Sequence, residues 1–229
     1  MNNALPEFIM EENKPLNETA VLVFSKAPVE GQVKTRLISE LGARGACELH
    51  THLLQRTLDM LMQVEDCDLQ LWWAGDIKHS FLSSPWLKKI SIKQQVSGDL
   101  GERMRHACEE TLQQYQQVIV IGTDCAVMTA EHLMEVKQQL QHGTEVVITP
   151  AEDGGYVLVA MREYVAEVFH NIAWGTASVF TQTRTILEQL DINWLAMPCL
   201  WDVDREADLL RLRESGSLLQ FDQRQDTVR

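Results

Sequence analysis

Two aspartates near the C-terminus, Asp202 and Asp204, have the side-chain type and spacing to bind a metal ion. In an extended segment, residues two apart project to the same side of the chain, so both carboxylates would face one ligand. Mg²⁺ prefers oxygen ligands and shares its octahedral shell with substrate phosphates. The alternative is an acidic loop before a helix that starts near Arg205, and Asp204 could cap that helix even while it binds a metal ion.

A loop with three cations follows the first apolar run of the chain. Lys26, Lys34 and Arg36 lie around Gly31 in a protein that is otherwise acidic. Glycine lets backbone N–H groups approach a phosphate closely, Arg can bind phosphate oxygens through two parallel hydrogen bonds, and Lys acts as a mobile point charge. The G-x-x-x-x-G-K-[ST] spacing of a Walker A loop is absent. The loop is either a phosphate-binding segment of another type or an ordinary surface turn.

Three further segments place polar residues or glycines after apolar runs. Asp124 follows the run at residues 118–121, where it could bind a metal–phosphate complex or act as a helix N-cap or turn aspartate. Residues 97–103 are rich in glycine and open a predicted helix, whose N-terminus could face a ligand. Gly154 and Gly155 lie in a predicted tight turn, where they either serve the turn alone or admit a substrate close to the backbone.

Hydrophobic periodicity predicts the elements that position these residues. Short apolar runs, typical of strands buried on both faces, occupy residues 21–24, 69–73, 118–121, 146–148, 156–160 and 194–197. Apolar residues recur at helical spacing over residues 46–61, 104–115, 129–141 and 176–190. This alternation predicts an α/β fold with a mostly parallel central sheet flanked by helices. In such a sheet ligands bind beyond the carboxyl ends of the strands, where the loops above lie.

Composition and charge narrow the class of protein. The formal net charge of −13 disfavours nucleic acid as a partner, because binding a polyanion requires a basic face. No run of about 18 apolar residues predicts a membrane span. The five cysteines are widely spaced and form no C-x-x-C pair, which argues against a zinc site or a disulfide framework and favours the cytoplasm. The seven histidines form no ligand set and are expected to be ordinary core or surface residues.

The simplest organisation is a single domain. We expect an N-terminal extension over residues 1–18, one domain over residues 19–213 and a polar C-terminal tail over residues 214–229. A chain of 229 residues can bury a large core without a disulfide or a structural metal ion.

In their order along the chain, these segments resemble a known superfamily. The segments that carry the resemblance are residues 26–28, 31, 34–37, 95, 98–104, 122–125, 153–156, 174–176, 202–204 and 208–209. They resemble the nucleotide-diphospho-sugar transferase superfamily, which has the glycosyltransferase-A fold. More narrowly, they resemble the bacterial radical-SAM/selenodomain-associated transferase family, which is similar to the phospholactate and molybdenum-cofactor guanylyltransferases. The sequence departs from the family pattern at Ala126 and at Arg205, where proline and threonine, respectively, are usual. The related nucleotidyltransferases also carry a lysine in the region that residues 39–41 occupy here.

The resemblance implies a role for each motif. The expected phosphate-loop residues are Lys26, Gly31, Lys34, Thr35 and Arg36. The residues expected near the nucleobase are Gln95 and Gly101, and those on the acceptor or sugar side are Asp153, Gly154 and Gly155. The expected ligands of Mg²⁺, or of Mn²⁺ in its place, are Asp124, Asp202 and Asp204.

Three hypotheses follow about activity. In the first, a phosphorylated acceptor attacks a nucleoside triphosphate, Asp124 holds the metal ion, and Lys34 and Arg36 stabilise the leaving pyrophosphate. In the second, a nucleotide-sugar donates its sugar and Asp153 acts as the base. In the third, the chain is an inactive nucleotide-binding scaffold. The expected partners are a nucleoside triphosphate or nucleotide-sugar and a small acceptor, without nucleic acid or membrane, and the oligomeric state stays open.

Overall fold

A computed structural model of the chain describes residues 17–215, so residues 1–16 and 216–229, which make up most of the predicted extension and tail, lie outside the described residues. The strands are β1 (Thr19–Lys26), β2 (Asp68–Ala74), β3 (Ser91–Gln94), β4 (Gln117–Ile121), β5 (Val146–Pro150), β6 (Tyr156–Met161) and β7 (Trp194–Ala196). The α-helices are α1 (Ile38–Leu61), α2 (Leu100–Thr111), α3 (Ala130–Gln141), α4 (Val179–Gln189) and α5 (Glu206–Glu214). The 3₁₀ helices are η1 (Thr35–Leu37), η2 (Ser80–Ser83), η3 (Pro85–Lys89) and η4 (Ala166–Phe169).

The strands form one seven-stranded sheet in the order β3-β2-β1-β4-β6-β5-β7. Four pairings are parallel, namely β1 with β2, β1 with β4, β2 with β3 and β5 with β7. β6 is antiparallel to both β4 and β5, because a short turn returns the chain directly after β5 without a crossover helix. The prediction of a mostly parallel central sheet is confirmed, and the turn of residues 151–155 lies at its carboxyl edge.

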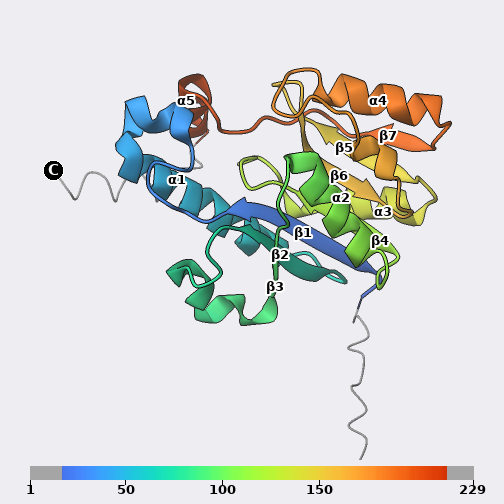
Figure 1. Ribbon diagram of the computed structural model, residues 1–229, viewed down its shortest axis with the longest axis horizontal. Helices are drawn as coiled ribbons and strands as arrows, with labels where there is room; N and C mark the ends of the chain where they lie inside the picture. The colour runs from blue at the N-terminus through green and yellow to red at the C-terminus, as the bar shows by residue number, and fades with distance from the viewer. Residues whose placement is uncertain (1–16, 216–229) are drawn as a thin grey trace, which may run out of the picture.

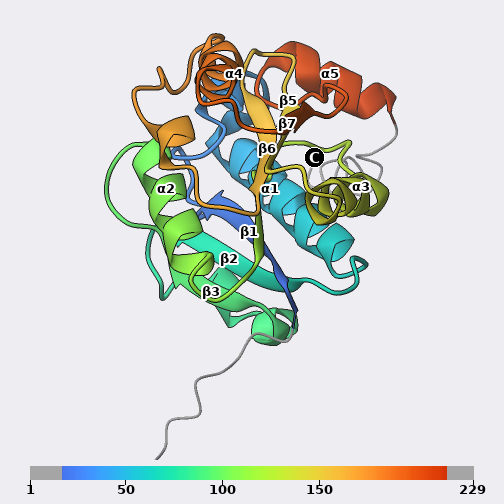
Figure 2. The same cartoon turned by 90° about the vertical axis from the view of Figure 1, so that its right-hand side faces the viewer.

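Helices cover both faces of the sheet (Figure 1 and Figure 2). Leu58 of α1 and Val136 of α3 belong to one buried cluster, which includes alternate residues of β1. Met104 of α2 and Leu187 of α4 belong to the cluster on the opposite face. Because the central strands are buried on both faces, they read as continuous apolar runs in the sequence.

A third, smaller cluster joins α5 to η1 and α1. It contains Leu37, Leu53, Val203 and Leu209, all of them buried. Figure 1 shows α5 beside the start of α1, although the two helices lie far apart in the sequence. The cluster holds residues 201–204 against α1 and so fixes the segment that carries Asp202 and Asp204.

Some element boundaries differ from the sequence expectation for local reasons. β3 was not predicted, because this edge strand has the sequence SIKQ and is at best half-buried, so no apolar run marks it. α2 begins at Leu100, within the segment predicted to open a helix, at a capping box in which Asp99 accepts from the Glu102 N–H and Glu102 accepts from the Asp99 N–H. It ends at Thr111, earlier than the predicted residue 115. α4 begins at Val179 rather than at Thr176, whose hydroxyl donates to the Ala173 carbonyl in the preceding turn at 2.7 Å.

The order of the strands brings several loops to one edge of the sheet. The carboxyl ends of β1, β4, β5 and β7 point the same way, and each is followed by one of the segments singled out in the sequence. Among residues 17–215, no helix combines the length and the apolar character needed to cross a membrane.

Candidate functional site

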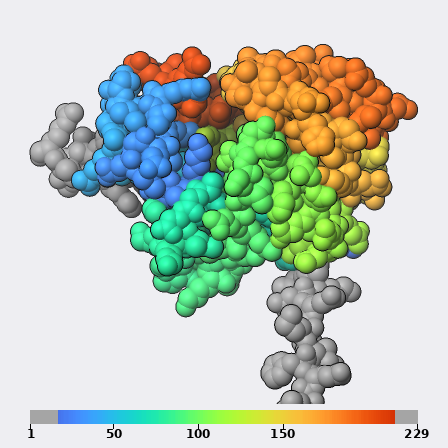
Figure 3. All heavy atoms as spheres, viewed as in Figure 1, coloured from blue at the N-terminus to red at the C-terminus, as the bar shows by residue number. Residues whose placement is uncertain are grey.

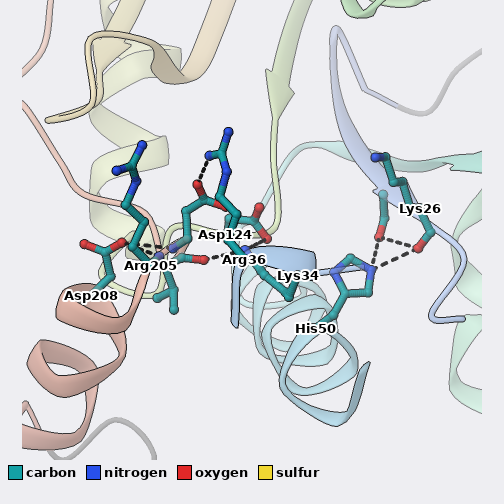
Figure 4. A network of polar contacts seen from close by, with 10 residues as sticks. Lys26, Lys34, Arg36, His50, Asp124, Arg205 and Asp208 are labelled. Atoms are coloured by element: carbon teal, nitrogen blue, oxygen red, sulfur yellow. Dashed lines mark hydrogen bonds and ion pairs between the residues drawn. The ribbon is translucent and has the colours of Figure 1, made fainter. Parts of the chain in front are cut away.

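The candidate site lies beyond the carboxyl ends of the strands. In the space-filling view, a hollow separates the blue segment, with β1 and the start of α1, from the orange segment that contains α4 (Figure 3). The loops after β1, β4, β5 and β7 approach this edge from different parts of the sequence. Ion pairs and hydrogen bonds join three of them into one network (Figure 4).

Lys34 is the residue that connects the basic loop to the acidic loops. Its Nζ lies 2.7 Å from Asp124 Oδ1 and donates to the Val203 carbonyl, and its side chain is only 3% exposed. The Lys34 backbone has φ 47° and ψ 40°, a left-handed conformation that is uncommon for residues with a side chain. This conformation ends the loop after β1 and turns the side chain inward, so the ammonium group lies between two other loops (Figure 4).

Asp124 lies at the end of β4, in the centre of the sheet order. Its Oδ1 atom is buried and, among the described residues, has no hydrogen-bond partner of good geometry, even though Lys34 Nζ is close. The side chain as a whole is 44% exposed, so its other oxygen faces outward. The Asp124 carbonyl also accepts from the Val203 N–H at 2.9 Å, which ties the loop after β4 to the segment before α5.

Asp202 and Asp204 flank Val203, which is fully buried while both aspartates are partly exposed. This alternation is what an extended segment with carboxylates on one side requires. The Asp204 carboxylate is ion-paired with Arg36 from η1, and the Asp208 carboxylate accepts from the backbone N–H groups of Asp204 and Arg205 at 3.1 and 2.7 Å. The segment is therefore held at both ends before α5 begins.

Negative charge accumulates around Asp202. Burial, followed by the nearby Asp153 and Asp124 carboxylates, raises the pKa of Asp202 to about 6, and Lys34 opposes this effect only in part. The hydrogen bond and charge of Asp204, with weaker contributions from Asp153 and Asp202, raise the pKa of the Arg36 guanidinium. The four predicted carboxylates are thus close enough to influence one another.

The predicted metal ligands are brought together only in part. The structure brings no group of three or more His, Cys, Asp or Glu side chains into a metal-binding arrangement anywhere in residues 17–215. Two of the three predicted ligands, Asp124 and Asp204, are instead paired with Lys34 and Arg36.

The turn between β5 and β6 places Asp153 on the exposed side of the site. The Asp153 carboxylate accepts from the Gly155 N–H at 2.8 Å. Gly154 has φ 91°, and a Cβ there would lie 2.1 Å from the Ala177 carbonyl oxygen. Gly154 is therefore required by the packing of residues 173–178 as well as by its backbone conformation.

Gln95 and Gly101, the residues predicted to lie near the nucleobase, make internal contacts. Gln95 Nε2 donates to the Trp72 carbonyl at 2.8 Å and to the Ser25 carbonyl at 3.4 Å. A Cβ on Gly101 would lie 2.3 Å from Trp174 Nε1, so the indole ring fills the space above this glycine. These contacts position the start of α2 next to residues 173–178, and the role in nucleobase binding stays a prediction.

The remaining residues of the predicted phosphate loop, Lys26, Gly31 and Thr35, are exposed. Gly31 has φ 76°, and a Cβ there would meet no atom within 4 Å, so its backbone conformation rather than crowding explains the glycine. These residues are open to solvent at the same edge of the sheet as Lys34.

His50 of α1 is a buried residue of this network that the sequence analysis treated as ordinary. Its Nε2 lies 3.0 Å from the Lys26 carbonyl oxygen and 3.5 Å from Ser25 Oγ (Figure 4). Burial lowers the pKa of His50, so the ring is neutral and fixes the point where the chain leaves β1. The sequence feature that could have revealed its burial is the place of His50 beside Leu49 on the apolar face of a predicted helix.

Comparisons with known proteins agree with this architecture. A family described as "Uncharacterized protein conserved in bacteria (DUF2064)" matches residues 57–176. A crystal structure from Desulfovibrio desulfuricans G20, of a protein assigned to the nucleotide-diphospho-sugar transferases, is 33% identical, with a TM-score of 0.79 over 85% of both chains. The predicted fold is thereby confirmed, and the expectation of a transferase agrees with the assignment of this relative.

More distant structures share the fold alone. CMP:2-keto-3-deoxy-manno-octonic acid synthetase in complex with CTP is 9% identical, with a TM-score of 0.56 over 88% of this chain and 99% of the synthetase. Rv0371C of Mycobacterium tuberculosis H37Rv in complex with manganese is 16% identical, with a TM-score of 0.54 over 87% of this chain and all of the other. No curated protein sequence matches this chain.

Proposed function

The chain belongs to the DUF2064 family of bacterial proteins, and we propose that it is a Mg²⁺-dependent nucleotidyltransferase, which moves a nucleoside monophosphate from a nucleoside triphosphate to a small phosphorylated acceptor. The observation that carries the proposal is the meeting of the basic loop after β1 with acidic loops after β4 and β7, through Lys34. Phosphates and a divalent cation need opposite kinds of partner, and this edge of the sheet offers both within one network.

Two features of these loops support the binding of a divalent cation. Asp124 has a buried carboxylate oxygen without a hydrogen bond of good geometry to any described residue. Burial, followed by the Asp153 and Asp124 charges, raises the pKa of Asp202 to about 6, so a cation nearby would favour its ionised form. Asp124, Asp202 and Asp204 would hold Mg²⁺, or Mn²⁺ in its place, because both accept oxygen ligands. When bound, the ion would neutralise phosphate charge and orient the triphosphate.

The side chains of the chain itself would bind and position the reactants. Lys34 and Arg36 would receive the β- and γ-phosphate oxygens, where negative charge grows as pyrophosphate leaves. An oxygen of the acceptor phosphate forms the new bond to the α-phosphorus as the bond to pyrophosphate breaks. The acceptor phosphate is already ionised at neutral pH, so this reaction requires no protein base, and buried, neutral His50 only fixes the end of β1.

Glycosyl transfer is the second candidate, and the assignment of the Desulfovibrio desulfuricans relative favours it. In this reaction an acceptor hydroxyl attacks the sugar carbon, a nucleoside diphosphate leaves, and a base receives the hydroxyl proton. Asp153 is the candidate base, because it is exposed at the edge of the site, where its Oδ1 accepts from the Gly155 N–H. The same loops would bind the diphosphate of the donor.

Thermal unfolding with each nucleoside triphosphate and with common nucleotide-sugars, with and without Mg²⁺, tests the proposal. A ligand at about 100 times its Kd stabilises the folded state by roughly 2.7 kcal/mol, which gives a visible rise in Tm. We expect a Mg²⁺-dependent rise with a triphosphate, and the rise should be lost in Asp124→Asn. Asp59→Asn, which changes an exposed aspartate of α1, is the matched control and should keep the rise.

Product analysis then separates the two reactions. Release of pyrophosphate from the stabilising triphosphate supports nucleotidyl transfer, whereas release of a nucleoside diphosphate from a nucleotide-sugar supports glycosyl transfer. If no nucleotide or nucleotide-sugar raises the Tm in either condition, the proposal is wrong, whereas a rise in Tm without release of either product would favour the inactive nucleotide-binding scaffold. The narrower kinship with the radical-SAM/selenodomain-associated transferases stays a prediction. A cytoplasmic location also stays a prediction, and the five free cysteines support it.

A further inference from the structure

The ammonium group of Lys34 already occupies a cation position among the acidic loops. It lies 2.7 Å from Asp124 Oδ1, donates to the Val203 carbonyl, and belongs to a side chain that is 3% exposed. A carboxylate oxygen and a backbone carbonyl oxygen from two separate loops are also the kinds of ligand that a divalent cation takes. The lysine therefore makes contacts that a metal ion at this position would otherwise make.

A second cation repeats this arrangement at the neighbouring loop. Arg36 is ion-paired with Asp204, and the side chains are 60% and 33% exposed. The two pairs differ in burial, because the Lys34 ammonium group is enclosed whereas Arg36 reaches outward into solvent. Both aspartates are partly exposed, at 44% for Asp124 and 33% for Asp204, so the difference between the pairs lies in the cation. Exposed ion pairs contribute little, whereas an enclosed ammonium group is left uncompensated when its pair breaks. Of these two pairs, the Lys34 pair would therefore control the access of a metal ion to the carboxylates.

We propose that the Lys34 ammonium group is the resident cation of this carboxylate site, and that a divalent ion replaces it only when nucleotide phosphates are present to receive the lysine. The identity of the phosphate ligand in this inference rests on the proposed function. The occupancy of the carboxylate site by the Lys34 ammonium group concerns the protein alone. Lys34 thereby links metal binding to nucleotide binding, and the free protein binds divalent ions weakly.

Electrostatics supports this exchange. A divalent ion that bound Asp124 beside an enclosed ammonium group would face a like charge at short distance, which opposes binding. Phosphate oxygens relieve this conflict, because they offer Lys34 a new anionic partner and offer the metal further oxygen ligands. The flexible four-carbon stem of lysine allows such a change of partner without movement of the backbone.

Binding of Mn²⁺ alone to the nucleotide-free protein tests the inference, with free Mn²⁺ measured by electron paramagnetic resonance. Lys34→Gln removes the charge and keeps an N–H donor for the Val203 carbonyl. An opposite charge within about 4–6 Å changes the proton affinity of a carboxylate by roughly 10- to 1,000-fold, so we expect Lys34→Gln to bind Mn²⁺ at least about tenfold more tightly than the wild type.

Two further variants control for charge and for folding. Lys93→Gln breaks the ion pair of Lys93 with Glu110 at 2.9 Å, in which both side chains are about 40% exposed, and should leave the Mn²⁺ affinity unchanged. Lys34→Arg keeps a positive charge and should stay within about threefold of the wild type. If Lys34→Gln does not fold, as judged by circular dichroism, Lys34→Met takes its place, since it retains the apolar stem of the lysine.

Equal Mn²⁺ affinities of a folded Lys34→Gln protein and the wild type would overturn the inference. So would a tight site for Mn²⁺ in the nucleotide-free wild type that Lys34→Gln weakens. Neither result depends on turnover or on nucleotide binding. Failure of the inference is therefore distinguishable from failure of the proposed function, which would appear as a lack of any nucleotide-dependent rise in Tm.

Discussion

Asp202 is a carboxylate whose surroundings resist its ionisation. Burial, then the charges of Asp153 and Asp124, raise its pKa from 3.8 to about 6. The folded state thus binds this proton more tightly than the unfolded chain does. The resulting stabilisation is fully present below about pH 3.8 and is lost as the pH rises through about 6.

Asp202→Asn keeps this side chain neutral at every pH. At pH 7.5 we expect its free energy of unfolding to exceed that of the wild type by about 1–2 kcal/mol, a figure reduced for the partial exposure of the side chain. The difference should disappear near pH 4, and urea denaturation across this range measures it. Asp59→Asn, on the exposed face of α1, should show no such pH-dependent gain. Equal stabilities of Asp202→Asn and the wild type at pH 7.5 would mean that burial and the neighbouring carboxylates do not disfavour the ionised form of Asp202.

At the level of residues, the sequence predicted a set of side chains for this edge of the sheet but not which of them pair. Asp124, Asp202 and Asp204 were expected to face a metal ion, yet Lys34 and Arg36 hold two of them. Such pairs join residues about 90 to 170 positions apart, and their geometry depends on side-chain rotamers and on how the loops pack. His50 escaped prediction for a similar reason, because its partner is the backbone carbonyl of Lys26, which no side-chain pattern reveals.

α5 is the element that positions the Asp202–Asp204 segment. Leu209 is 2% exposed and packs with Leu37, Leu53 and Val203, so it anchors α5 to α1. Leu209→Ala should lower the free energy of unfolding by about 2–4 kcal/mol, since it removes buried methyl groups and leaves a cavity. Chemical denaturation gives this value, and a weaker Mg²⁺-dependent nucleotide effect on the Tm should accompany it.

Leu210 provides a matched control on the same helix. It follows Leu209 directly but is 50% exposed, so Leu210→Ala should change the free energy of unfolding by less than about 0.5 kcal/mol. A similar loss of stability in both variants would mean that packing against α1 is not the source of the effect, because alanine has the higher helix propensity and cannot weaken the helix in that way. A large loss in Leu209→Ala without any change in nucleotide binding would show that α5 does not position the aspartates.

At the level of elements, burial decided what the sequence could predict. β4 and β5 are buried along their whole length and were predicted from their apolar runs. β3 lies at the edge of the sheet and its four residues are exposed or half-buried, so no pattern distinguished it from a loop. The turn at residues 151–155 was predicted from its glycines, but the antiparallel place of β6 between β4 and β5 depends on how the whole sheet assembles.

The whole molecule carries a net charge of −13, and a nucleoside triphosphate would add further negative charge. Under the proposed function, we expect its binding to depend on the local cations of the loop after β1 and on a metal ion at the loops after β4 and β7. These loops are already linked, because Lys34 contacts Asp124 and the Val203 N–H donates to the Asp124 carbonyl at 2.9 Å. A ligand that bridges them should order all of them together.

Hydrogen–deuterium exchange tests this coupling across the molecule. With Mg²⁺ and the stabilising triphosphate, we expect exchange to slow in residues 27–37, 122–126 and 201–209 at the same time, because ordering one loop restrains its partners. Residues 181–189 of α4, which belong to none of these loops, serve as the internal reference and should exchange at an unchanged rate. Protection confined to residues 27–37 would mean that the phosphates contact the basic loop alone. A ligand held in that way would leave the carboxylates without a role in binding and would remove the main support for a metal-dependent transferase.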